Sequence, residues 1–367
     1  MDNFNRLRRM ATNESPPRKS LVLVVGAGAS KEVRLPVGEE LKQAIAKSLS
    51  FRVENMSRIV GGDHTIVEAM YQLVQQPGNQ RGNVNPYLHS ASLISGAMPQ
   101  AQSIDNFIDS HRSDPRIAQV GKLAIASCIL KAERASSLRV DRSNIYNKIN
   151  FAGVGNTWFN GLFQLIVQSC QQDELAARLQ KLAVISFNYD RCLEHFLHGA
   201  LQNYYRMLPE QATAAMSHLQ IMHPYGTVGS LPWSDASRGV EYGGEPSSQQ
   251  LISLSSQIRT FTESTDPTAS EIVNLRSTIR SAERVAFLGF AFHPLNLELL
   301  YGEKAKKSAA SDASVYATAM GLSDSDARLI ESDLASLGGY QEGNVNLHKA
   351  LTAAALFREY TRSLSLQ

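Results

Sequence analysis

The sequence predicts an α/β fold in which a Rossmann-like parallel sheet is flanked by helices. Short apolar runs, the first at residues 21–25, are typical of strands that are buried on both faces of a parallel sheet. Between these runs the apolar residues recur at helical spacing, and residues 51–180 contain no strong candidate for a strand. We therefore expect a large helical insertion after the first strand and helix.

The predicted elements alternate along the second half of the chain. After the strand at 21–25, buried strands are expected at residues 182–187, 219–222, 284–288 and 314–318, and the last of these is expected to end the sheet. Helices are expected after residue 191 and at residues 39–50, 117–132, 158–170, 268–282, 295 onward, 323–337 and 346–364. Parallel strands need crossovers of this kind, so the order agrees with the predicted fold class.

The domain organisation follows from composition. Residues 1–19 are polar and basic, which is typical of a flexible arm, although such an arm can also become ordered on a partner subunit. Residues 20–367 read as one domain, with a helical lobe at about 51–180 inserted into it.

Composition also limits the classes of function. The net charge of +2 neither requires nor excludes a nucleic-acid or membrane surface. Three widely spaced cysteines, Cys128, Cys170 and Cys192, form no CxxC pair, so we expect no zinc site, no other metal and no disulfide framework. No apolar run is long enough to cross a bilayer, and the run at 21–25 is too short for a signal peptide. These features predict a soluble cytoplasmic protein.

The first candidate site is the segment Gly26–Ser30, with the sequence GAGAS, directly after the strand at 21–25. Two glycines let the backbone turn sharply and approach a ligand closely. A helix that begins there would direct free amide groups at an anion. The segment therefore predicts a phosphate- or dinucleotide-binding turn, and a tight turn without a ligand is the alternative.

Three further strand ends have unusual sequences. They contain Asn188 with Asp190, His223, and Gly289 with Asn296. Because ligands bind outside the carboxyl ends of the strands in open parallel sheets, we expect these loops and the glycine turn to meet at one crevice. Each has a structural alternative: the Asn and Asp residues can cap helices, His223 can be a loop histidine with satisfied hydrogen bonds, and Gly289 can be an ordinary strand-end glycine.

The order of four segments resembles the sirtuin-like superfamily. The segments are GAGAS at 26–30, SFNYD at 186–190, HPYG at 223–226 and GFAFHPLN at 289–296. The chain is more similar to the bacterial antiphage NAD⁺ hydrolases of this superfamily than to its protein deacylases. The segment Ser103–Phe107 also resembles one that is common in the bacterial branch.

The sequence differs from the protein deacylases of the superfamily in two features. The deacylases have an arginine-containing loop after the glycine turn, whereas this sequence has Leu35-Pro-Val-Gly38 there. Their cysteine-bound zinc module is also missing from the sequence. Both departures disfavour an acyl-lysine peptide as substrate and favour NAD⁺ itself.

The resemblance implies a role for each matching residue. Asn188 would hold the ribose or the attacking water, His223 would activate that water, and Asp190 would contact the carboxamide of nicotinamide. The remaining residues that the resemblance implies for binding the dinucleotide are Gly26, Ala27, Gly28, Ser30, Gly289, Phe290 and Asn296.

The function that the resemblance implies is hydrolysis of NAD⁺ to nicotinamide and ADP-ribose, as the toxic effector of bacterial antiphage defence that acts by NAD depletion. A catalytically silent NAD- or ADP-ribose-binding subunit that regulates a partner ATPase is the main alternative, and an NAD-dependent protein deacylase is another. A dehydrogenase is disfavoured because residues about 20 positions after the turn read as helix rather than as a second strand with an acidic end. Expected partners are further copies of the chain and a HerA-type ATPase ring, without a membrane or direct nucleic-acid contact.

Overall fold

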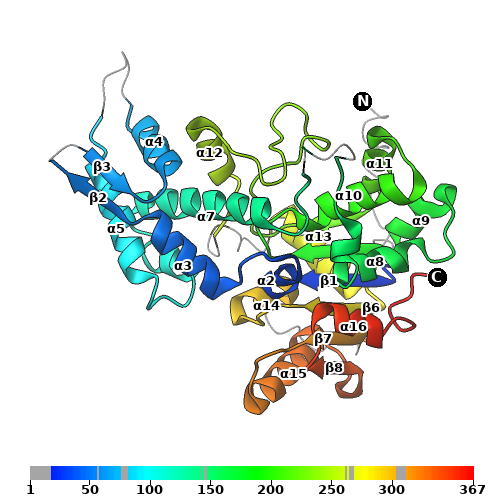
Figure 1. Cartoon of the computed structure of the whole chain (residues 1–367). Helices are drawn as coiled ribbons and strands as arrows, with labels where there is room; N and C mark the ends of the chain where they lie inside the picture. Colours follow the sequence, from blue (N-terminus) through cyan, green and yellow to red (C-terminus); the bar gives the residue numbers. More distant parts are fainter. Residues whose placement is uncertain are drawn as a thin grey trace, which may run out of the picture.

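The computed structural model (Figure 1) describes residues 18–55, 58–75, 82–141, 143, 147–260, 263, 268–302 and 311–367. Of the predicted arm at 1–19, residues 1–17 lie outside the described residues.

The fold is built on a six-stranded parallel sheet. Its strands are β1 (Leu21–Val25), β4 (Leu182–Ser186), β5 (Gln220–Met222), β6 (Arg284–Leu288), β7 (Ser314–Thr318) and β8 (Val345–His348). They pair in the order β5-β4-β1-β6-β7-β8, and each pairing is parallel. Counted along the chain this is the 3-2-1-4-5-6 order of the Rossmann fold, so the predicted fold class is confirmed.

The central strand β1 is buried on both faces, as its continuous apolar sequence predicts. Its register aligns Val24 with Ile185 of β4 and with Phe287 of β6. All five predicted strands are present, with bounds within one residue of those predicted. The sheet therefore brings the ends of β1, β4 and β6 side by side.

Helices cover both faces of the sheet (Figure 1). One face packs on α8 (Trp158–Val167), α9 (Leu175–Gln180), α10 (Cys192–Tyr205), α11 (Pro209–Met216) and α16 (Ala353–Glu359). The other packs on α13 (Ser270–Arg280), α14 (Pro294–Tyr301) and α15 (Asp324–Gly338). Along β1, Leu21 and Leu23 face the first layer, whereas Val22 and Val24 face the second, as the two-residue period of a strand requires.

A second group of helices extends from one end of the sheet, on the left of Figure 1. It comprises α3 (Gly38–Ser48), α4 (His64–Leu73), α5 (Asn85–Ala97), α6 (Ile104–Ser110), α7 (Pro115–Ala135) and α12 (Ser248–Ser255). The long helix α7 contacts all the others. Residues 26–181 separate β1 from β4, and within this stretch α8 and α9 pack over the sheet rather than with the group around α7.

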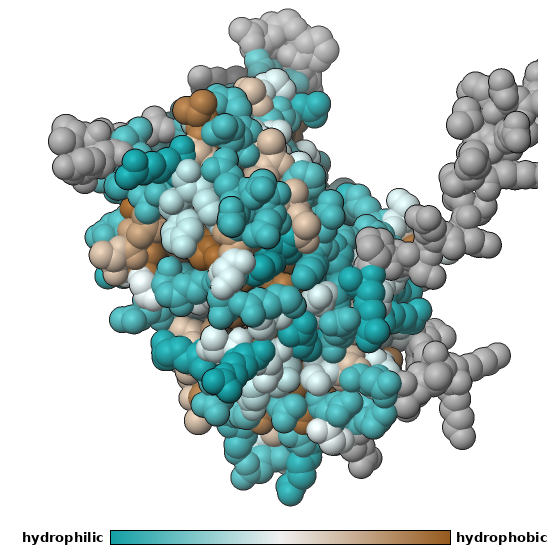
Figure 2. All heavy atoms as spheres, turned by 90° about the vertical axis from the view of Figure 1, so that its right-hand side faces the viewer, coloured by the Kyte–Doolittle hydropathy of each residue, from teal (hydrophilic) through white to brown (hydrophobic). Residues whose placement is uncertain are grey.

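The short elements complete the description. They are α2 (Ala27–Ser30) and the 3-10 turns η1 (Lys31–Val33), η2 (Phe151–Val154), η3 (Gln172–Glu174) and η5 (Glu342–Asn344). Seen from the side of α9 and α11, the surface is largely hydrophilic, with smaller hydrophobic areas between (Figure 2). Among the helices of the described residues, none combines the length and the apolar character needed to cross a membrane.

Two predictions of secondary structure are wrong. The predicted last strand at 314–318 is followed by another, β8, in a stretch that the sequence assigns to a helix at 346–364, and only α16 lies in that range. A hairpin of β2 (Phe51–Glu54) and β3 (Arg58–Gly61) lies where no strand is predicted. Both misses have one cause, since β8 is only half-buried at the sheet edge and the hairpin is largely exposed, so no buried apolar run marks them.

Candidate functional site

The glycine turn after β1 packs directly against the turn after β6. The amide of Gly26 donates to the carbonyl of Leu288 at 2.9 Å, and that of Gly28 donates to the carbonyl of Gly289 at 3.0 Å. A Cβ on Gly26 would lie 2.6 Å from the Gly289 oxygen. Gly289 has a φ of +55°, and a Cβ there would lie 2.0 Å from the nitrogen of Ala29. Close backbone approach within the fold is thus a sufficient reason for these glycines.

Asn188 joins the glycine turn to the loop after β4. Its side chain is buried and donates to the carbonyl of Gly26 at 3.2 Å and to Oγ of Ser30 at 3.0 Å. Ala27 and Gly28 stay exposed beside this contact. The contact brings together two of the predicted loops, from β1 and from β4.

Asp190 lies at the start of α10. Its Oδ1 accepts a hydrogen bond from the amide of Cys192 at 3.1 Å, which satisfies one of the free amides of the first helical turn. The N-cap of α10 is Arg191, so Asp190 supports the helix start from the position before the cap rather than as the predicted cap. Burial raises the pKa of the Asp190 carboxyl, and the hydrogen bonds from Cys192 and Ser30 oppose that rise.

His223 follows β5 and lies against α10. Its Nε2 is 2.7 Å from Oε1 of Glu194, and its Nδ1 is 3.3 Å from the carbonyl of Asn188. Burial lowers the pKa of His223, but the neighbouring Glu194 carboxylate outweighs burial, so that the pKa lies above its ordinary value. Burial likewise raises the pKa of Glu194, and His223 outweighs it and lowers that pKa. Both ring nitrogens are satisfied, which was the structural alternative for this residue.

Glu194 is a site residue that the sequence motifs do not predict. The signal that was available is an acidic residue on the inner side of an amphipathic helix, between the apolar residues Leu193 and Phe196. Such a residue needs a buried partner, since an unpaired buried carboxylate is costly. The partner is His223, which the sequence places after a different strand.

The side chains from the three loops surround one small cavity. It is lined by, among others, Ser30, Trp158, Asn188, Asp190, Glu194 and His223. Its volume is about 10 Å³, which is room for one water molecule. The structure thus brings together the three predicted catalytic residues with Ser30, around a space much smaller than a nicotinamide ring.

The other predicted binding residues lie outside this cavity. Phe290 is buried in an aromatic cluster, with its ring 5.0 Å from that of Phe187. Asn296 accepts a hydrogen bond at 2.6 Å from the hydroxyl of Tyr225. The predicted alternative that Asn296 caps α14 is wrong, because His293 is the N-cap and accepts from the amide of Leu295.

Asp105 connects the helices around α7 to the loop of Asn188 and Asp190. The hydroxyl of Tyr189 donates to Oδ1 of Asp105 at 2.5 Å. Burial raises the pKa of Asp105 to about 6, although this hydrogen bond lowers it. Asp105 belongs to the segment Ser103–Phe107 that the sequence analysis singled out, but its contact with Tyr189 was not predicted.

A buried ion pair fixes the beginning of α10. The guanidinium of Arg191 lies 2.6 Å from the carboxylate of Glu133 on α7, and the two side chains are 2% and 0% exposed. Arg191 also donates to the carbonyls of Ser230 and Val240, at 3.2 and 2.6 Å. The pair therefore holds the candidate site, α7 and the loop 229–243 together.

Within the described residues, no three His, Cys, Asp or Glu side chains are grouped as the ligands of a metal ion would be. A scan against protein-family models finds no match to the sequence, and a search of curated proteins finds none with significant similarity.

Proposed function

We propose that the protein hydrolyses the N-glycosidic bond of NAD⁺ and releases nicotinamide and ADP-ribose. The observation that carries this proposal is the meeting of Asn188, Asp190 and His223, from two strand ends, around one cavity beside the glycine turn. The motifs that meet there are the ones in which the sequence resembles the sirtuin-like NAD⁺ hydrolases. The Rossmann strand order supports it, since dinucleotides bind at this end of such sheets.

Cleavage of this bond needs no general acid to protonate the leaving group. The nicotinamide of NAD⁺ is already cationic and leaves with the electron pair of the C–N bond, so that positive charge develops on the ribose. The buried carboxylate of Asp190 would stabilise that charge or hold the carboxamide. Asn188, which already contacts Ser30, would orient the ribose or the water.

His223 would act as the general base. When it is neutral with the proton on Nε2 towards Glu194, Nδ1 is an acceptor, and it must turn away from the carbonyl of Asn188 to accept from water. Water would attack the anomeric carbon, and its proton would pass to Nδ1. The products are ADP-ribose and a protonated His223, and release of that proton restores the starting form of the enzyme. Because the cavity has room for one water, the reaction needs a more open form of the site in which these side chains separate.

Two observations favour the alternative, a subunit that binds NAD⁺ or ADP-ribose without turnover. Both nitrogens of His223 are occupied by protein groups, and the amide of Gly28 donates to Gly289 rather than facing outward. A site that is satisfied internally can serve as a sensor. The resemblance of the sequence extends oligomerisation and pairing with a HerA-type ATPase to either proposal, whereas antiphage defence by NAD depletion belongs to the hydrolase alone.

The test is nicotinamide release from NAD⁺ by the purified protein, measured by liquid chromatography. Asn188→Ala and His223→Ala should each lower the rate at least about 100-fold, the order expected for a lost catalytic group. His218→Ala, at an exposed histidine, serves as the matched control. Folded Asn188→Ala and His223→Ala variants with full activity would refute the assignment. Binding of NAD⁺ without any release by the wild-type protein would favour the sensor instead.

A further inference from the structure

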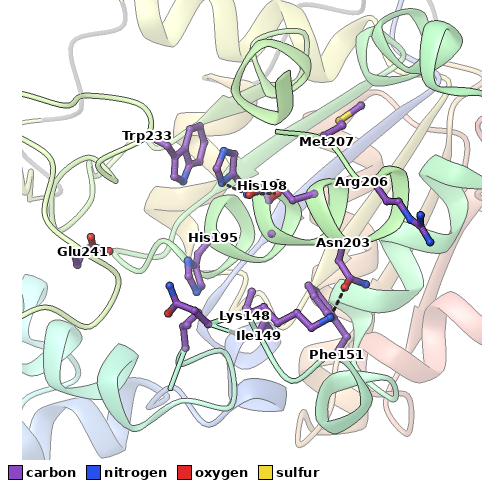
Figure 3. Close-up of a pocket in the computed structure, with 14 residues that line it drawn as sticks. Lys148, Ile149, Phe151, His195, His198, Asn203, Arg206, Met207, Trp233 and Glu241 are labelled. Carbon is purple, nitrogen blue, oxygen red and sulfur yellow. Dashed lines mark hydrogen bonds between the residues drawn. The ribbon is translucent and has the colours of Figure 1, made fainter. Parts of the chain in front are cut away.

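A second and much larger cavity lies on another face of α10 (Figure 3). Its volume is about 550 Å³, within the roughly 300–1,000 Å³ that is typical of small-molecule sites. The cavity lies between α10, the segment 147–151 and the loop 229–243. Gly199 permits the close approach of that segment, because a Cβ there would lie 3.2 Å from Cδ1 of Ile149.

His195, His198 and Trp233 line one side of this cavity, and their rings belong to two stacked pairs. The imidazole of His195 stacks on Tyr242 with centroids 4.1 Å apart and an interplanar angle of 2°. That of His198 stacks on Trp233 at 4.3 Å and 6°. Each pair joins α10 to the loop that Arg191 holds through backbone carbonyls. This side of the cavity, called the aromatic wall below, is therefore held in place by ring stacking.

The aromatic wall offers one hydrogen-bond acceptor that suits the amino group of a heteroaromatic base. His195 donates from Nε2 to the carbonyl of Leu138 at 3.0 Å, and burial lowers its pKa to about 4, so the ring is neutral near pH 7. In that tautomer Nδ1 is an acceptor, and it has no partner among the described residues. The indole Nε1 of Trp233 is a buried donor that, in the described part of the chain, is likewise unpaired.

Charged side chains are separated along the cavity. Figure 3 shows Lys148 and Arg206 towards the end of α10 and Glu241 on the opposite side. The ammonium of Lys148 is 3.0 Å from Oδ1 of Asn203, and Arg206 is the exposed C-cap of the helix. This gradient orients a ligand that has an anionic group at one end.

We propose that this cavity binds an adenine mononucleotide. The amino group of the base donates to Nδ1 of His195 beside the aromatic wall, and the phosphate lies between Lys148 and Arg206. Apolar side chains, among them Ile149, Phe151 and Met207, cover the ribose and the base. The site is separate from the one proposed for NAD⁺ and does not depend on turnover there.

The test is isothermal titration calorimetry of the full chain with AMP, and with adenosine and inorganic phosphate as separate probes. The double variant Lys148→Glu/Arg206→Glu should weaken AMP binding at least tenfold and leave adenosine binding nearly unchanged. His195→Phe preserves the stacking on Tyr242 and should weaken both AMP and adenosine. Arg52→Glu, an exposed arginine on β2, is the control for a charge change elsewhere.

Each outcome decides the matter. AMP binding that is unchanged in the double variant would overturn the proposal. AMP binding that is lost in Asn188→Ala and displaced by NAD⁺ would also overturn it, because this result would place the nucleotide in the other site. Absence of AMP binding at millimolar concentration would overturn it as well. If His195→Phe does not fold, as judged by circular dichroism, the double variant still decides, because both of its positions are on the surface.

Discussion

His223 and Glu194 form a partly buried pair, with Nε2 and Oε1 2.7 Å apart, that joins the end of β5 to the first turn of α10. The pair raises the pKa of the histidine against the effect of burial. A base whose pKa is raised is protonated over a wider range of pH. The pair therefore has a consequence for how the proposed activity depends on pH.

Glu194→Gln should move the acidic limb of the pH profile to lower pH. His223 accepts a proton only when it is neutral, so the activity of the wild-type protein rises as pH increases through the raised pKa. Without the carboxylate, burial is opposed only by the carbonyl of Asn188 and the charge of Asp190, so the pKa of His223 falls. The profile of kcat/KM for nicotinamide release measures the shift, and an NMR titration of the imidazole gives the same pKa without turnover. Glu210→Gln is the control and should leave the acidic limb of the pH profile in place. The prediction would be contradicted if Glu194→Gln left it in place as well.

Asp105→Asn should remove a pH dependence of stability. The pKa of Asp105 is about 6 in the folded state and 3.8 ordinarily, so between these values the folded state binds more protons than the unfolded state. The free energy of unfolding of the wild-type protein therefore decreases as pH rises from about 4 to 6, and stays reduced above that. The variant keeps an acceptor for Tyr189 and lacks this decrease. Thermal unfolding from pH 4 to 8 measures the difference, and the exposed Asp173→Asn should leave the decrease in place.

Gly289→Ala should destabilise the fold by more than about 2 kcal/mol, because the Cβ would lie 2.0 Å from the nitrogen of Ala29 and the φ of +55° disfavours an L side chain. Gly96→Ala is a matched control within α5, where a Cβ meets nothing within 4 Å. It should be neutral or stabilising by up to about 1 kcal/mol. Urea denaturation gives both values. Equal midpoints for the two variants would show that the two turns tolerate separation.

Arg191→Met should cost about 3–5 kcal/mol, since it leaves the carboxylate of Glu133 buried without its partner. The surface pair of Lys31 and Glu40, with side chains 59% and 47% exposed, is the comparison. Lys31→Met should change the free energy of unfolding by less than about 1 kcal/mol. The same denaturation experiment compares them, and a cost for Arg191→Met as small as that of Lys31→Met would contradict this prediction.

The strands that the sequence predicts are those with a buried apolar pattern. The strand at 21–25 is a continuous apolar run, the strands at 182–187 and 284–288 are mainly apolar, and the three form the centre of the sheet. The hairpin at 51–61 and the strand at 345–348 are not marked, because exposed or edge strands gain their stability from pairing rather than from burial.

The candidate site likewise has residues that the sequence predicts and partners that it does not predict. Strand-end motifs indicate Asn188, Asp190 and His223, because loops after parallel strands converge. The partners of these residues come from helices, and a contact such as that of Glu194 with His223 depends on how α10 is rotated against β5. The closure of the cavity, at about 10 Å³, depends on side-chain packing that no motif encodes.

The strand order of the sheet has a consequence for how the chain reaches its fold. β1 is the first strand along the chain, yet its two neighbours are β4 at Leu182–Ser186 and β6 at Arg284–Leu288. During synthesis the five apolar residues of β1 therefore emerge long before either partner, and both sides of the strand stay unpaired in that interval. Contacts between residues so distant in sequence form slowly, since a long loop must close first. The central strand is thus both the most buried element of the finished fold and the one exposed longest to unintended pairing while the chain grows.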